Sequence, residues 1–510
     1  GDVNAIVSPT AKSDVIWLRL GGDNAFEPFS DPRVRKAIAL ATDREALVKA
    51  AYQDLGSPSL YQIDSRMPYP SPPPPEPYSY DVEAARQLLA DAGYGDGFSF
   101  ELIGFNGRPG PQAEPIAVLV KSNLSQIGID VNVNMVASSA DYNAGRSQDG
   151  PYVAWIDQYL SLVPDPSYHV GLFLKSTSPY NLAGYENLRV DELVELTTAL
   201  EPGAERDVLL QEMVTILQED TVVIPLVEDT FLVSLGGDIQ GYYPVANLRV
   251  YPHRLYRGER TTAAAPVAEC PSGSVEGDLF TMAIPSVPNS LDPSVPQGNA
   301  SNDTYSVWVS TLIQYANLGP DPGGLQGPED IVGELAESWS RNDDGSYTVT
   351  LRSACSAAGN QLTSEDVRWS LERAKEFDPI AVFLFDAGNF DTENLVTIID
   401  EKTFTINVTN PSVVTLRTLI PENLPVLDST EALKHATADD PWASEWLATN
   451  IASFGPYTLE SFTPGEEIRL VANQHYWGGV PSFDQVVIRA VPESSTRMQL
   501  LASGEVDFAG

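Results

Sequence analysis

The chain has 510 residues, and its 30 Lys and Arg against 70 Asp and Glu give a formal net charge of −40. Such a surface repels nucleic-acid phosphates and anionic lipids, which argues against both as partners. The hydrophobic fraction of 43% is too high for a disordered chain. At about 150 residues per domain, the length predicts roughly three domains or two large lobes.

Hydrophobic runs are short throughout the chain. The longest, such as 222–227 and 380–385, have the length of a strand, so no membrane-spanning helix is expected. The first ten residues contain neither the basic stretch nor the apolar core of a signal peptide, which indicates that a signal peptide is absent or has been removed.

Helix and strand patterns alternate in the first part of the chain. Apolar residues at helical spacing predict a pair of helices over 31–52 and a further helix over 81–94. A strand is predicted at 98–105, followed by a helix at 117–128 and a strand at 129–136. Repeated alternation of this kind predicts an α/β lobe.

Two segments show neither the helix nor the strand period. The proline-rich stretch 70–77 cannot form a helix or a central strand and is predicted to be a rigid surface loop. Residues 258–277 are small and polar and resemble a chain terminus placed in mid-sequence. By contrast, 3–7 and 15–20 have the pattern of strands, although real termini are usually loose.

Three long motifs resemble one protein family. Leu335–Lys375 contains LAESW, a turn at Asp344-Gly345, TVTLR and a helix start at Thr363, an order similar to that of the family 5 extracellular solute-binding proteins. These are the dipeptide, oligopeptide and nickel receptors of ABC importers. Phe454–Gly510, with GPY, NQHYWGG and GEVD, and Phe29–Asp54, with DPRVRKAI, resemble other parts of the same family.

The order of these motifs differs from the family order. The LAESW and GPY blocks normally precede the DPRVR block, whereas here 266–510 resembles the usual N-terminal half and 1–257 the usual C-terminal half. The chain is therefore predicted to be circularly permuted, which domains tolerate because their termini often lie close together.

The resemblance implies an α/β protein with the two-lobed fold of periplasmic binding proteins, of the cluster C type with an extra subdomain. Lobe II is expected over 21–225. Lobe I, including the extra subdomain, is expected over 1–20, 226–257 and 275–510, and 258–274 is expected to link the usual C- and N-termini. In such a fold the ligand binds in the cleft and stabilises the form closed about the hinge.

The resemblance also indicates ligand-binding residues in lobe II. Trp155, Asp157 and Tyr159 are similar to a region in which an acid holds the ligand's ammonium group, and their odd spacing places them on one face of a strand. Ala154 replaces the family's Gly, Asp157 comes one residue early and Asp165-Pro166 comes several late, which weakens the case for a peptide ligand. The alternative is a packed strand with a hydrogen-bonded acid.

In lobe I the resemblance places Asn289, Tyr315 and Phe454 along the cleft. Aromatic faces with a few polar anchors suit a cyclic or elongated organic ligand. Packing in the core or in a loop is the alternative for each of the three. Tyr457 and Trp477 are assigned to packing.

The two cysteines, Cys270 and Cys355, allow a single pairing. Cysteines that are scarce and even in number fit an exported protein, so a disulfide is predicted, with two buried free thiols as the alternative.

No catalytic or metal-binding motif stands out. The four histidines, His169, His253, His435 and His475, have no zinc-binding spacing, and no GxSxG, P-loop or GxGxxG motif follows a strand. We therefore expect no enzyme activity, no cofactor and no metal. A carbohydrate-active hydrolase is the least favoured alternative, because the many carboxylates make a nearby pair inevitable by chance.

The expected function is that of an exported receptor, periplasmic or at the cell surface. It would capture a small organic ligand, such as a peptide, an oligosaccharide or an amino-acid conjugate, and deliver it to the permease of an ABC importer. A sensor or chaperone of the same fold that presents its ligand is the alternative. The protein is expected to be a monomer that contacts the membrane only through the permease or a removed lipid anchor.

Overall fold

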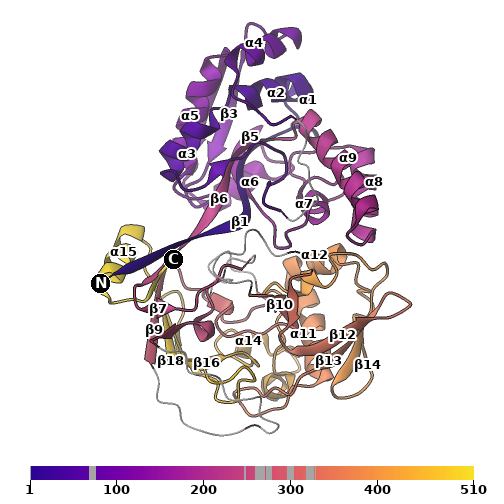
Figure 1. Cartoon of the computed structure of the whole chain (residues 1–510), viewed down its shortest axis with the longest axis vertical. Coiled ribbons are helices and arrows are strands. Elements are labelled where there is room, and N and C mark those ends of the chain that lie inside the picture. Colours follow the sequence, from indigo (N-terminus) through magenta and orange to yellow (C-terminus); the bar gives the residue numbers. More distant parts are fainter. Residues whose placement is uncertain are drawn as a thin grey trace. The chain divides into compact units, whose positions relative to one another are not determined.

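The computed structural model describes residues 2–67, 76–245, 249–258, 278–295, 304–317 and 329–510, together with Cys270 and Gly327. The chain divides into two compact units. Unit 1 comprises Gly1–Ser8 and Phe231–Gly510, and unit 2 comprises Pro9–Thr230 (Figure 1). Two long strands, β1 (Val3–Leu18) and β6 (Val223–Gly236), each contain residues of both units.

The sheet of unit 2 is mixed. Besides β1 and β6 it contains β5 (Ala154–Leu160), β3 (Phe98–Gly104) and β4 (Ile129–Met135), in the order β6-β1-β5-β3-β4, and the short β2 (Ser57–Pro58) pairs with β6. β3 is parallel to both β4 and β5, whereas β1 is antiparallel to β5. Parallel neighbours need crossover connections, which the helices provide. The predicted α/β class is thus confirmed.

The predicted pair of helices at the start of unit 2 is confirmed as α2 (Pro32–Ala41) and α3 (Arg44–Tyr52). Each begins after an aspartate, Asp31 or Asp43, whose carboxylate accepts a hydrogen bond from a backbone N–H of the first turn. The third predicted helix is α4 (Val82–Asp91). The remaining helices of this unit are α1 (Glu27–Ser30), α5 (Ala113–Ser125), α6 (Ser139–Arg146), α7 (Pro166–Phe173), α8 (Leu188–Ala199) and α9 (Ala204–Asp220).

The core of unit 2 lies on one face of its sheet. Ile16 and Leu18 of β1 and Ala154 and Ile156 of β5 belong to a single buried hydrophobic cluster with residues of α2, α3 and α5. Because side chains alternate along a strand, the odd-numbered residues of β5 point to the opposite face. That face carries the three predicted ligand-binding residues of the unit.

Unit 1 contains a larger and a smaller sheet. The larger one has the order β16-β17-β18-β9-β19-β6, with β16 (Tyr457–Thr463), β17 (Glu467–Ala472), β18 (Phe483–Ala490), β9 (Asp278–Ile284) and β19 (Phe508–Ala509). The smaller one has the order β12-β13-β15-β14, with β12 (Ala336–Arg341), β13 (Tyr347–Leu351), β15 (Thr403–Ile406) and β14 (Val396–Ile398).

Short pairs and helices complete unit 1. The strand pairs are β10 (Ile313–Tyr315) with β11 (Ile331–Gly333) and β7 (Ile239–Gln240) with β8 (Tyr256–Arg257). The helices are α11 (Ser364–Phe377), α12 (Pro379–Ala387), α13 (Ser429–Ala432), α14 (Ser444–Leu447) and α15 (Ser494–Ser503), with single 3₁₀ turns at η1 (Pro252–Arg254), η2 (Arg417–Leu419) and η3 (Leu433–His435).

The local signals quoted for the LAESW motif are confirmed. Asp344-Gly345 forms the turn between β12 and β13, with Gly345 at a φ of 88° that favours glycine. Thr363 and Asp366 form a reciprocal capping box at the start of α11. The apolar run 380–385, which has the length of a strand, instead lies in α12, because Asp378 caps that helix and Pro379 occupies its first position.

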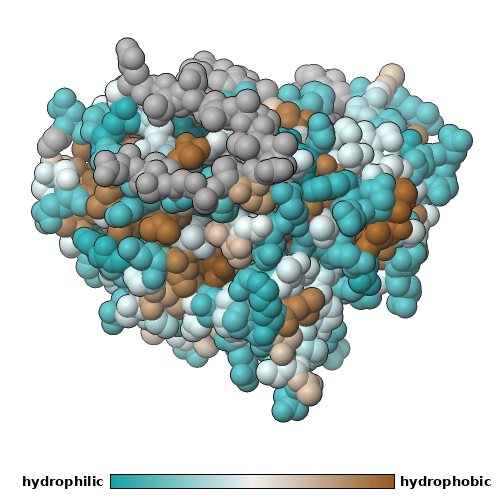
Figure 2. Space-filling model, turned by 90° about the horizontal axis from the view of Figure 1, so that it is seen from below, coloured by the Kyte–Doolittle hydropathy of each residue, from teal (hydrophilic) through white to brown (hydrophobic). Residues whose placement is uncertain are grey.

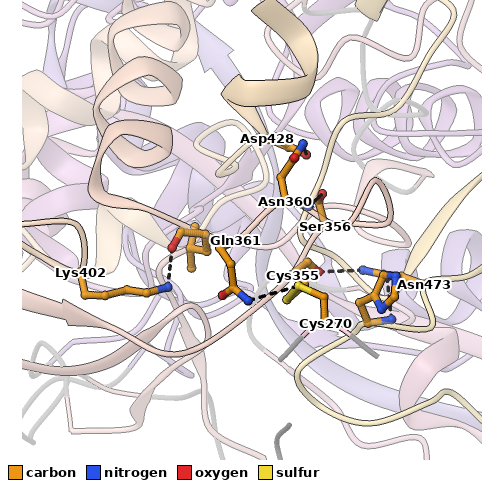
Figure 3. Close-up of a disulfide and its surroundings, with 10 residues drawn as sticks. Cys270, Cys355, Ser356, Asn360, Gln361, Lys402, Asp428 and Asn473 are labelled. Carbon is orange, nitrogen blue, oxygen red and sulfur yellow. Dashed lines mark hydrogen bonds between the residues drawn. A yellow bond between two sulfur atoms is a disulfide. The ribbon is translucent and has the colours of Figure 1, made fainter. Parts of the chain in front are cut away.

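The predicted disulfide is confirmed. Cys270 and Cys355 are bonded, with their Cα atoms 5.8 Å apart. Gln361 donates a hydrogen bond from Nε2 to Sγ of Cys270 at 3.2 Å, and Asn473 donates from Nδ2 to the carbonyl oxygen of Cys355 at 3.3 Å (Figure 3). The bond ties the segment between β8 and β9 to the loop between β13 and α11. The other residues of 259–277, and most of the proline-rich loop predicted at 70–77, lie outside the described residues.

The face drawn in Figure 2 shows hydrophilic residues spread over the surface, with smaller hydrophobic groups between them. Among the helices that the structure describes, none is both long enough and apolar enough to cross a membrane.

Candidate functional site

The odd-numbered face of β5 carries an aromatic cluster. Trp155 stacks on Trp17 of β1 with ring centroids 6.0 Å apart and planes 8° apart, and Tyr159 meets Trp17 edge-on at 5.2 Å. Phe173 of α7 packs against Tyr159 at 5.0 Å. Trp155 and Tyr159 thus lie on one face, as predicted, and both are buried.

Asp157, between these two aromatic residues, is held by two arginines. Arg108, in the loop after β3, donates from Nε to Oδ1, and Arg146 at the end of α6 donates from Nη1 to Oδ2 at 2.9 Å. The Asp157 side chain is 3% exposed, whereas those of Arg108 and Arg146 are 30% and 21% exposed. Both carboxylate oxygens are therefore engaged, and the more accessible groups of the set are cationic.

The surroundings keep Arg108 charged. Burial by itself lowers the pKa of this guanidinium, but the charge and the hydrogen bond of Asp157 raise it above its ordinary value. Two guanidinium groups and one carboxylate give the set a net charge of about +1, in a protein whose formal charge is −40. The Asp157 set, defined as Asp157 with Arg108 and Arg146, is thus a local positive region.

Three polar atoms of the aromatic cluster have no hydrogen-bond partner within the described part of the chain. They are Nε1 of Trp155, the hydroxyl oxygen of Tyr159 and Nε2 of His169. The three side chains are at most 2% exposed, and the Tyr159 and His169 rings lie 4.4 Å apart. A buried polar atom without a partner costs about 1–3 kcal/mol, so each of the three would gain from a further hydrogen bond.

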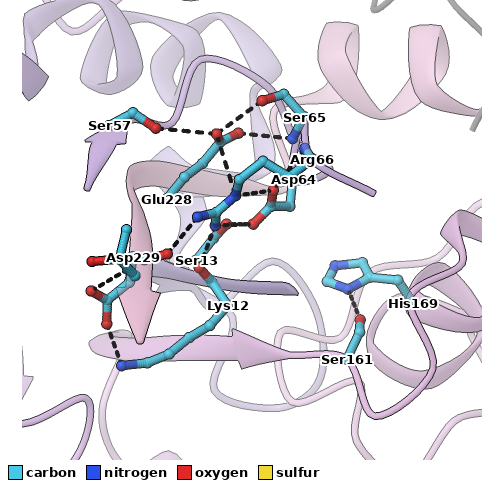
Figure 4. Close-up of polar contacts among 11 residues, drawn as sticks. Lys12, Ser13, Ser57, Asp64, Ser65, Arg66, Ser161, His169, Glu228 and Asp229 are labelled. Atoms are coloured by element: carbon cyan, nitrogen blue, oxygen red, sulfur yellow. Dashed lines mark hydrogen bonds and ion pairs between the residues drawn. The ribbon is translucent and has the colours of Figure 1, made fainter. Parts of the chain in front are cut away.

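His169 itself is part of the packed interior. Its Nδ1 shares a hydrogen bond with Oγ of Ser161 at 2.7 Å (Figure 4). Burial lowers the pKa of His169 to about 3, so the imidazole is neutral around pH 7. Neither side chain is more than 1% exposed, which leaves this Ser–His pair no contact with solvent.

The Asp165-Pro166 pair has a structural role. Asp165 caps α7 by accepting a hydrogen bond from the backbone N–H of Ser167, and Pro166 is the first residue of that helix. Nη2 of Arg206 contacts both Asp165 oxygens, at 2.8 and 3.0 Å. Both side chains are buried, so this acid orients α7.

The residues predicted on lobe I lie on three separate segments of unit 1. Asn289 is exposed in the loop after β9, Tyr315 is buried at the end of β10, and Phe454 is fully buried just before β16. Their contact with a ligand stays a prediction. The packing role of Tyr457 is confirmed, because it is 1% exposed and its hydroxyl donates to the carbonyl oxygen of Phe483 at 3.0 Å. Trp477 packs against Arg352, whose Cζ atom lies 3.8 Å from the centroid of the Trp477 ring.

Arg108 and Arg146 were not among the residues predicted from the sequence. A signal exists for Arg108, because β3 and β5 pair in parallel with Ile103 opposite Trp155, which places the loop after β3 beside Asp157 in the middle of β5. No such signal exists for Arg146, which reaches Asp157 only because α6 packs beside β5. Among the residues that the structure describes, no group of three or more His, Cys, Asp or Glu side chains is arranged to hold a metal ion.

The comparison with protein families matches two segments of the chain. The model of the bacterial extracellular solute-binding proteins, family 5 Middle, matches residues 2–181 and 330–510, together more than half of the chain. The protein therefore belongs to this family, as its motifs predicted. The predicted fold class, a two-lobed α/β fold of the family 5 type, is confirmed with it.

The chain spans about half the length of the individual relatives that it matches. The probable D,D-dipeptide-binding periplasmic protein DdpA of Escherichia coli is 32% identical over 247 residues, which are 48% of this chain and 45% of that protein. Heme-binding protein A of Haemophilus influenzae is 27% identical over 227 residues, 42% of this chain and 40% of that protein. Among solved structures, the periplasmic binding protein DppA of Helicobacter pylori, in complex with the peptide STSA, aligns with a TM-score of 0.43 and 20% identity over 50% of this chain and 49% of that one.

Proposed function

We propose that the protein is an extracytoplasmic receptor that captures a small organic solute and delivers it to an ABC importer. The observation that carries this proposal is membership of the family 5 solute-binding proteins over two segments of the chain. The relatives are named for binding a D,D-dipeptide, heme or glutathione, so the family resemblance does not select one ligand. The Asp157 set and the aromatic cluster of unit 2 favour some classes of ligand over others.

The Asp157 set favours a ligand with a carboxylate or another anionic group. The acid that the resemblance assigned to an ammonium group already accepts from two arginines, and these arginines are the more exposed partners. Charge-assisted hydrogen bonds from arginine to a carboxylate are among the strongest in proteins. The local positive charge also offsets the repulsion that a net charge of −40 exerts on an anion.

The aromatic cluster adds a second requirement. Trp155 supplies an N–H donor, and Tyr159 supplies a hydroxyl, both without partners among the described residues. A ligand whose oxygen atoms reach the N–H of Trp155 and the hydroxyl of Tyr159 would satisfy both groups. Of the ligand classes expected from the sequence, peptides and amino-acid conjugates meet both requirements, whereas a neutral oligosaccharide meets only the second.

The test is a thermal-shift screen followed by calorimetry on the full chain. The panel contains short peptides, amino-acid conjugates, oligosaccharides and metal chelates, each acid paired with its amide. A ligand that binds only the native state raises the melting temperature by mass action. We expect the shift to need the carboxylate and to tolerate acetylation of the amine. A shift confined to neutral oligosaccharides would contradict the anionic ligand but not the receptor.

Variants separate the site from the fold. Arg108→Gln and Arg146→Gln should each weaken binding by about 10-fold or more, the loss of about 1.4 kcal/mol that one charge-assisted hydrogen bond contributes. Arg368→Gln, in an exposed pair on α11, is the matched control and should leave affinity unchanged. If Trp155→Ala and Asp157→Ala both retain full affinity in a folded protein, the assigned site is wrong.

Binding, rather than catalysis, is the role that the site supports. The contact between Ser161 and His169 is fully buried, which does not suit a hydrolytic nucleophile. Recovery of the ligand unchanged after incubation is the expected result, and a cleaved product would favour the hydrolase alternative. A sensor or chaperone of the same fold is distinguished by its membrane partner, which a pull-down with solubilised permease would identify.

We also propose that the two halves of the family fold occur in exchanged order. The motif order supports this, and so do two contacts at the end of β6: the N–H of Gly236 donates to the carbonyl oxygen of Asp507, and the N–H of Gly237 donates to that of Asp2, both at 2.8 Å. A chain rebuilt as 278–510 followed by 1–257 should therefore fold and bind the same ligand. A peptide map that shows 257–278 as two separate ends, rather than one continuous segment, would overturn the exchange.

The lobe boundaries, the monomeric state and export stay proposals. The disulfide supports an oxidising compartment, the periplasm or the cell surface. We propose that units 1 and 2 are the two lobes of the receptor, with β1 and β6 as the connecting strands. Light scattering on the purified protein should give the mass of one chain, and a larger mass would overturn the monomer.

A further inference from the structure

A buried cluster of charged side chains lies where β1, β6 and the segment 57–67 meet within unit 2 (Figure 4). It contains four carboxylates that are at most 7% exposed, those of Asp14, Asp64, Glu228 and Asp229. Its two cations are Lys12 and Arg66, whose side chains are 20% and 18% exposed. We call these six residues the strand-crossing cluster.

One half of the cluster is well satisfied. Arg66 donates to Asp64 at 2.6 Å and lies 3.8 Å from Glu228. Oγ of Ser13 donates to Asp64 at 2.8 Å, and the backbone N–H and hydroxyl of Ser65 donate to Glu228 at 2.8 and 2.9 Å. These carboxylates are therefore held by several donors each.

The other half is not balanced. Lys12 forms an ion pair with Asp229. Asp14, which is 0% exposed, accepts one hydrogen bond at Oδ2, from the neutral hydroxyl of Tyr52. Its Oδ1 has no hydrogen-bond partner among the described residues. Asp14 is thus a fully buried acid whose neighbouring cation is already paired with a second acid.

The number of charges in the strand-crossing cluster also indicates that one of its acids, Asp14, is the group that takes up a proton. Within the strand-crossing cluster as the described residues define it, four carboxylates face two cations when every group is ionised, and the carboxylates are at most 7% exposed. Burying an unpaired charge is costly enough that the group takes up a proton instead. Burial raises the pKa of Asp14 to about 7, with Asp229 and Asp157 adding to the shift and Lys12 and Tyr52 opposing it. The pKa of Glu228 is also raised, first by burial and then by Asp64.

The groups that face Asp14 come from every element packed around it. They are Lys12 on the same strand, Tyr52 of α3, Asp229 of β6, Asp157 of β5 and, through its own charge, Arg108 after β3. The Arg108 charge is shared with Asp157, to which it donates. The surroundings therefore contain two cations, each already paired with another acid, and one hydroxyl that favour ionisation of Asp14, against burial and those two acids, which oppose it.

We propose that the strand-crossing cluster is a proton switch in which Asp14 is neutral in mildly acidic solution and ionises as the solution becomes alkaline. In the neutral form β1, β6 and α3 pack around an uncharged carboxyl group. Ionisation places an unbalanced negative charge beside Asp229 and loosens these strands. Because β1 and β6 each run from unit 2 into unit 1, the proton acts on the two strands that join the units.

The sign of the pH effect follows from the proton count. Between the unfolded value of 3.8 and the folded value of about 7, the native protein holds a proton on Asp14 that the unfolded chain has lost. Stability contributed by this group is therefore complete below about pH 4 and is lost progressively as the pH rises to about 7. Above that range, the contribution no longer changes.

The experiment compares the wild type with Asp14→Asn, which keeps the shape and cannot ionise. Hydrogen exchange of the full chain, followed by mass spectrometry at pH 5.5 and 8.5 and corrected for the intrinsic rate, should show faster exchange in peptides covering 12–18 and 223–230 at the higher pH. The β16–β17 hairpin of unit 1 is the internal reference and should not change. In Asp14→Asn the difference between the two pH values should disappear.

Tyr52→Phe and Asp130→Asn provide matched variants. Removing the Tyr52 hydroxyl takes away a donor to the ionised form, so the transition should move to higher pH. Asp130→Asn, on the exposed edge of β4, should leave the wild-type profile unchanged. An Asp14→Asn protein that is folded and keeps the full pH difference would overturn the proposal.

A direct titration covers the case in which Asp14→Asn does not fold. Carboxyl-¹³C NMR of the wild type labelled at aspartate should show one resonance that titrates near neutral pH, far above the others. The absence of such a resonance would overturn the proposal. A melting temperature that rises with sodium or potassium, but not with choline at equal ionic strength, would also overturn it, because the cluster would then hold a cation instead of a proton. None of these readouts requires a transport ligand, so the proposal can fail while the receptor function stands.

Discussion

Arg373 and Asp292 form a two-point ion pair in the interior of unit 1. Nη1 and Nη2 of Arg373 donate to Oδ1 and Oδ2 of Asp292 at 2.8 and 2.5 Å, and neither side chain is more than 1% exposed. The two residues are 81 positions apart, so their contact holds α11 against the segment that follows β9. Each charge depends on the other, because little water reaches either.

We expect Asp292→Ala to lower the free energy of unfolding by about 3–5 kcal/mol, since it leaves a buried guanidinium without its partner. The double variant Arg373→Met with Asp292→Leu should recover much of this loss, because it removes both charges and fills their volume. Urea unfolding followed by circular dichroism measures both values. A loss below about 1 kcal/mol for the single variant would mean that water or another group replaces the carboxylate.

The disulfide should contribute strongly to the stability of unit 1. Cys270 and Cys355 are 85 residues apart, and closing a loop of that length stabilises by roughly 4–5 kcal/mol in the chain-entropy model. The variant Cys270→Ser with Cys355→Ser should unfold at correspondingly lower urea concentration. Reduction of the wild type should reproduce the loss and leave the double variant unaffected; an unchanged midpoint on reduction would show that the bond contributes little.

Salt should stabilise the protein. A net charge of −40 makes the native state repel itself, and this repulsion weakens as the screening length falls from about 10 Å at 0.1 M to about 3 Å at 1 M salt. We expect the melting temperature to rise steadily over this range in sodium, potassium and choline chloride alike. Scanning calorimetry is the measurement, and a melting temperature independent of salt would show that the carboxylates are locally compensated.

His169 should make the protein less stable in acid. Its folded pKa of about 3 lies below the ordinary 6.5, so the unfolded chain binds a proton there that the native protein does not. The contribution of His169 to the free energy of unfolding is complete above about pH 6.5. As the pH falls from 6.5 to 3, this contribution decreases by up to about 1.4 kcal/mol per pH unit. This is opposite in sign to the effect of Asp14 over much of the same range.

The variant His169→Gln separates the two effects. It cannot titrate, so urea unfolding between pH 4 and 6.5 should lose the part of the slope that His169 contributes. Combined with Asp14→Asn, it should remove both contributions, so that the slope that remains comes from other groups such as Glu228, whose pKa is also raised. A slope that is unchanged in His169→Gln would mean that His169 takes up its proton in the native state.

Much of the architecture was predictable because its signals are local. Asp31 and Asp43 indicate helix starts, because an aspartate side chain caps the first turn of a helix. The two-residue period of a strand places Trp155, Asp157 and Tyr159 on one face. The cysteine pairing needed no structure, since two cysteines allow one bond. The apolar run 380–385 shows the limit of such reasoning, because its composition suits either element and only the capping residue Asp378 makes it helical.

Only the tertiary structure shows which charged side chains are buried next to one another. The sequence around Asp157 does not show that Arg108 and Arg146, 49 and 11 positions away, occupy both of its oxygens, although the parallel pairing of β3 with β5 gives a signal for Arg108. Likewise Lys12 meets Asp229 from 217 positions away, and among the described residues no cation forms an ion pair with Asp14. Sequence patterns record the environment of each residue along its own strand or helix. The electrostatics of a site depend on strands and helices brought together from distant parts of the chain, where burial strengthens every charge that is left unpaired.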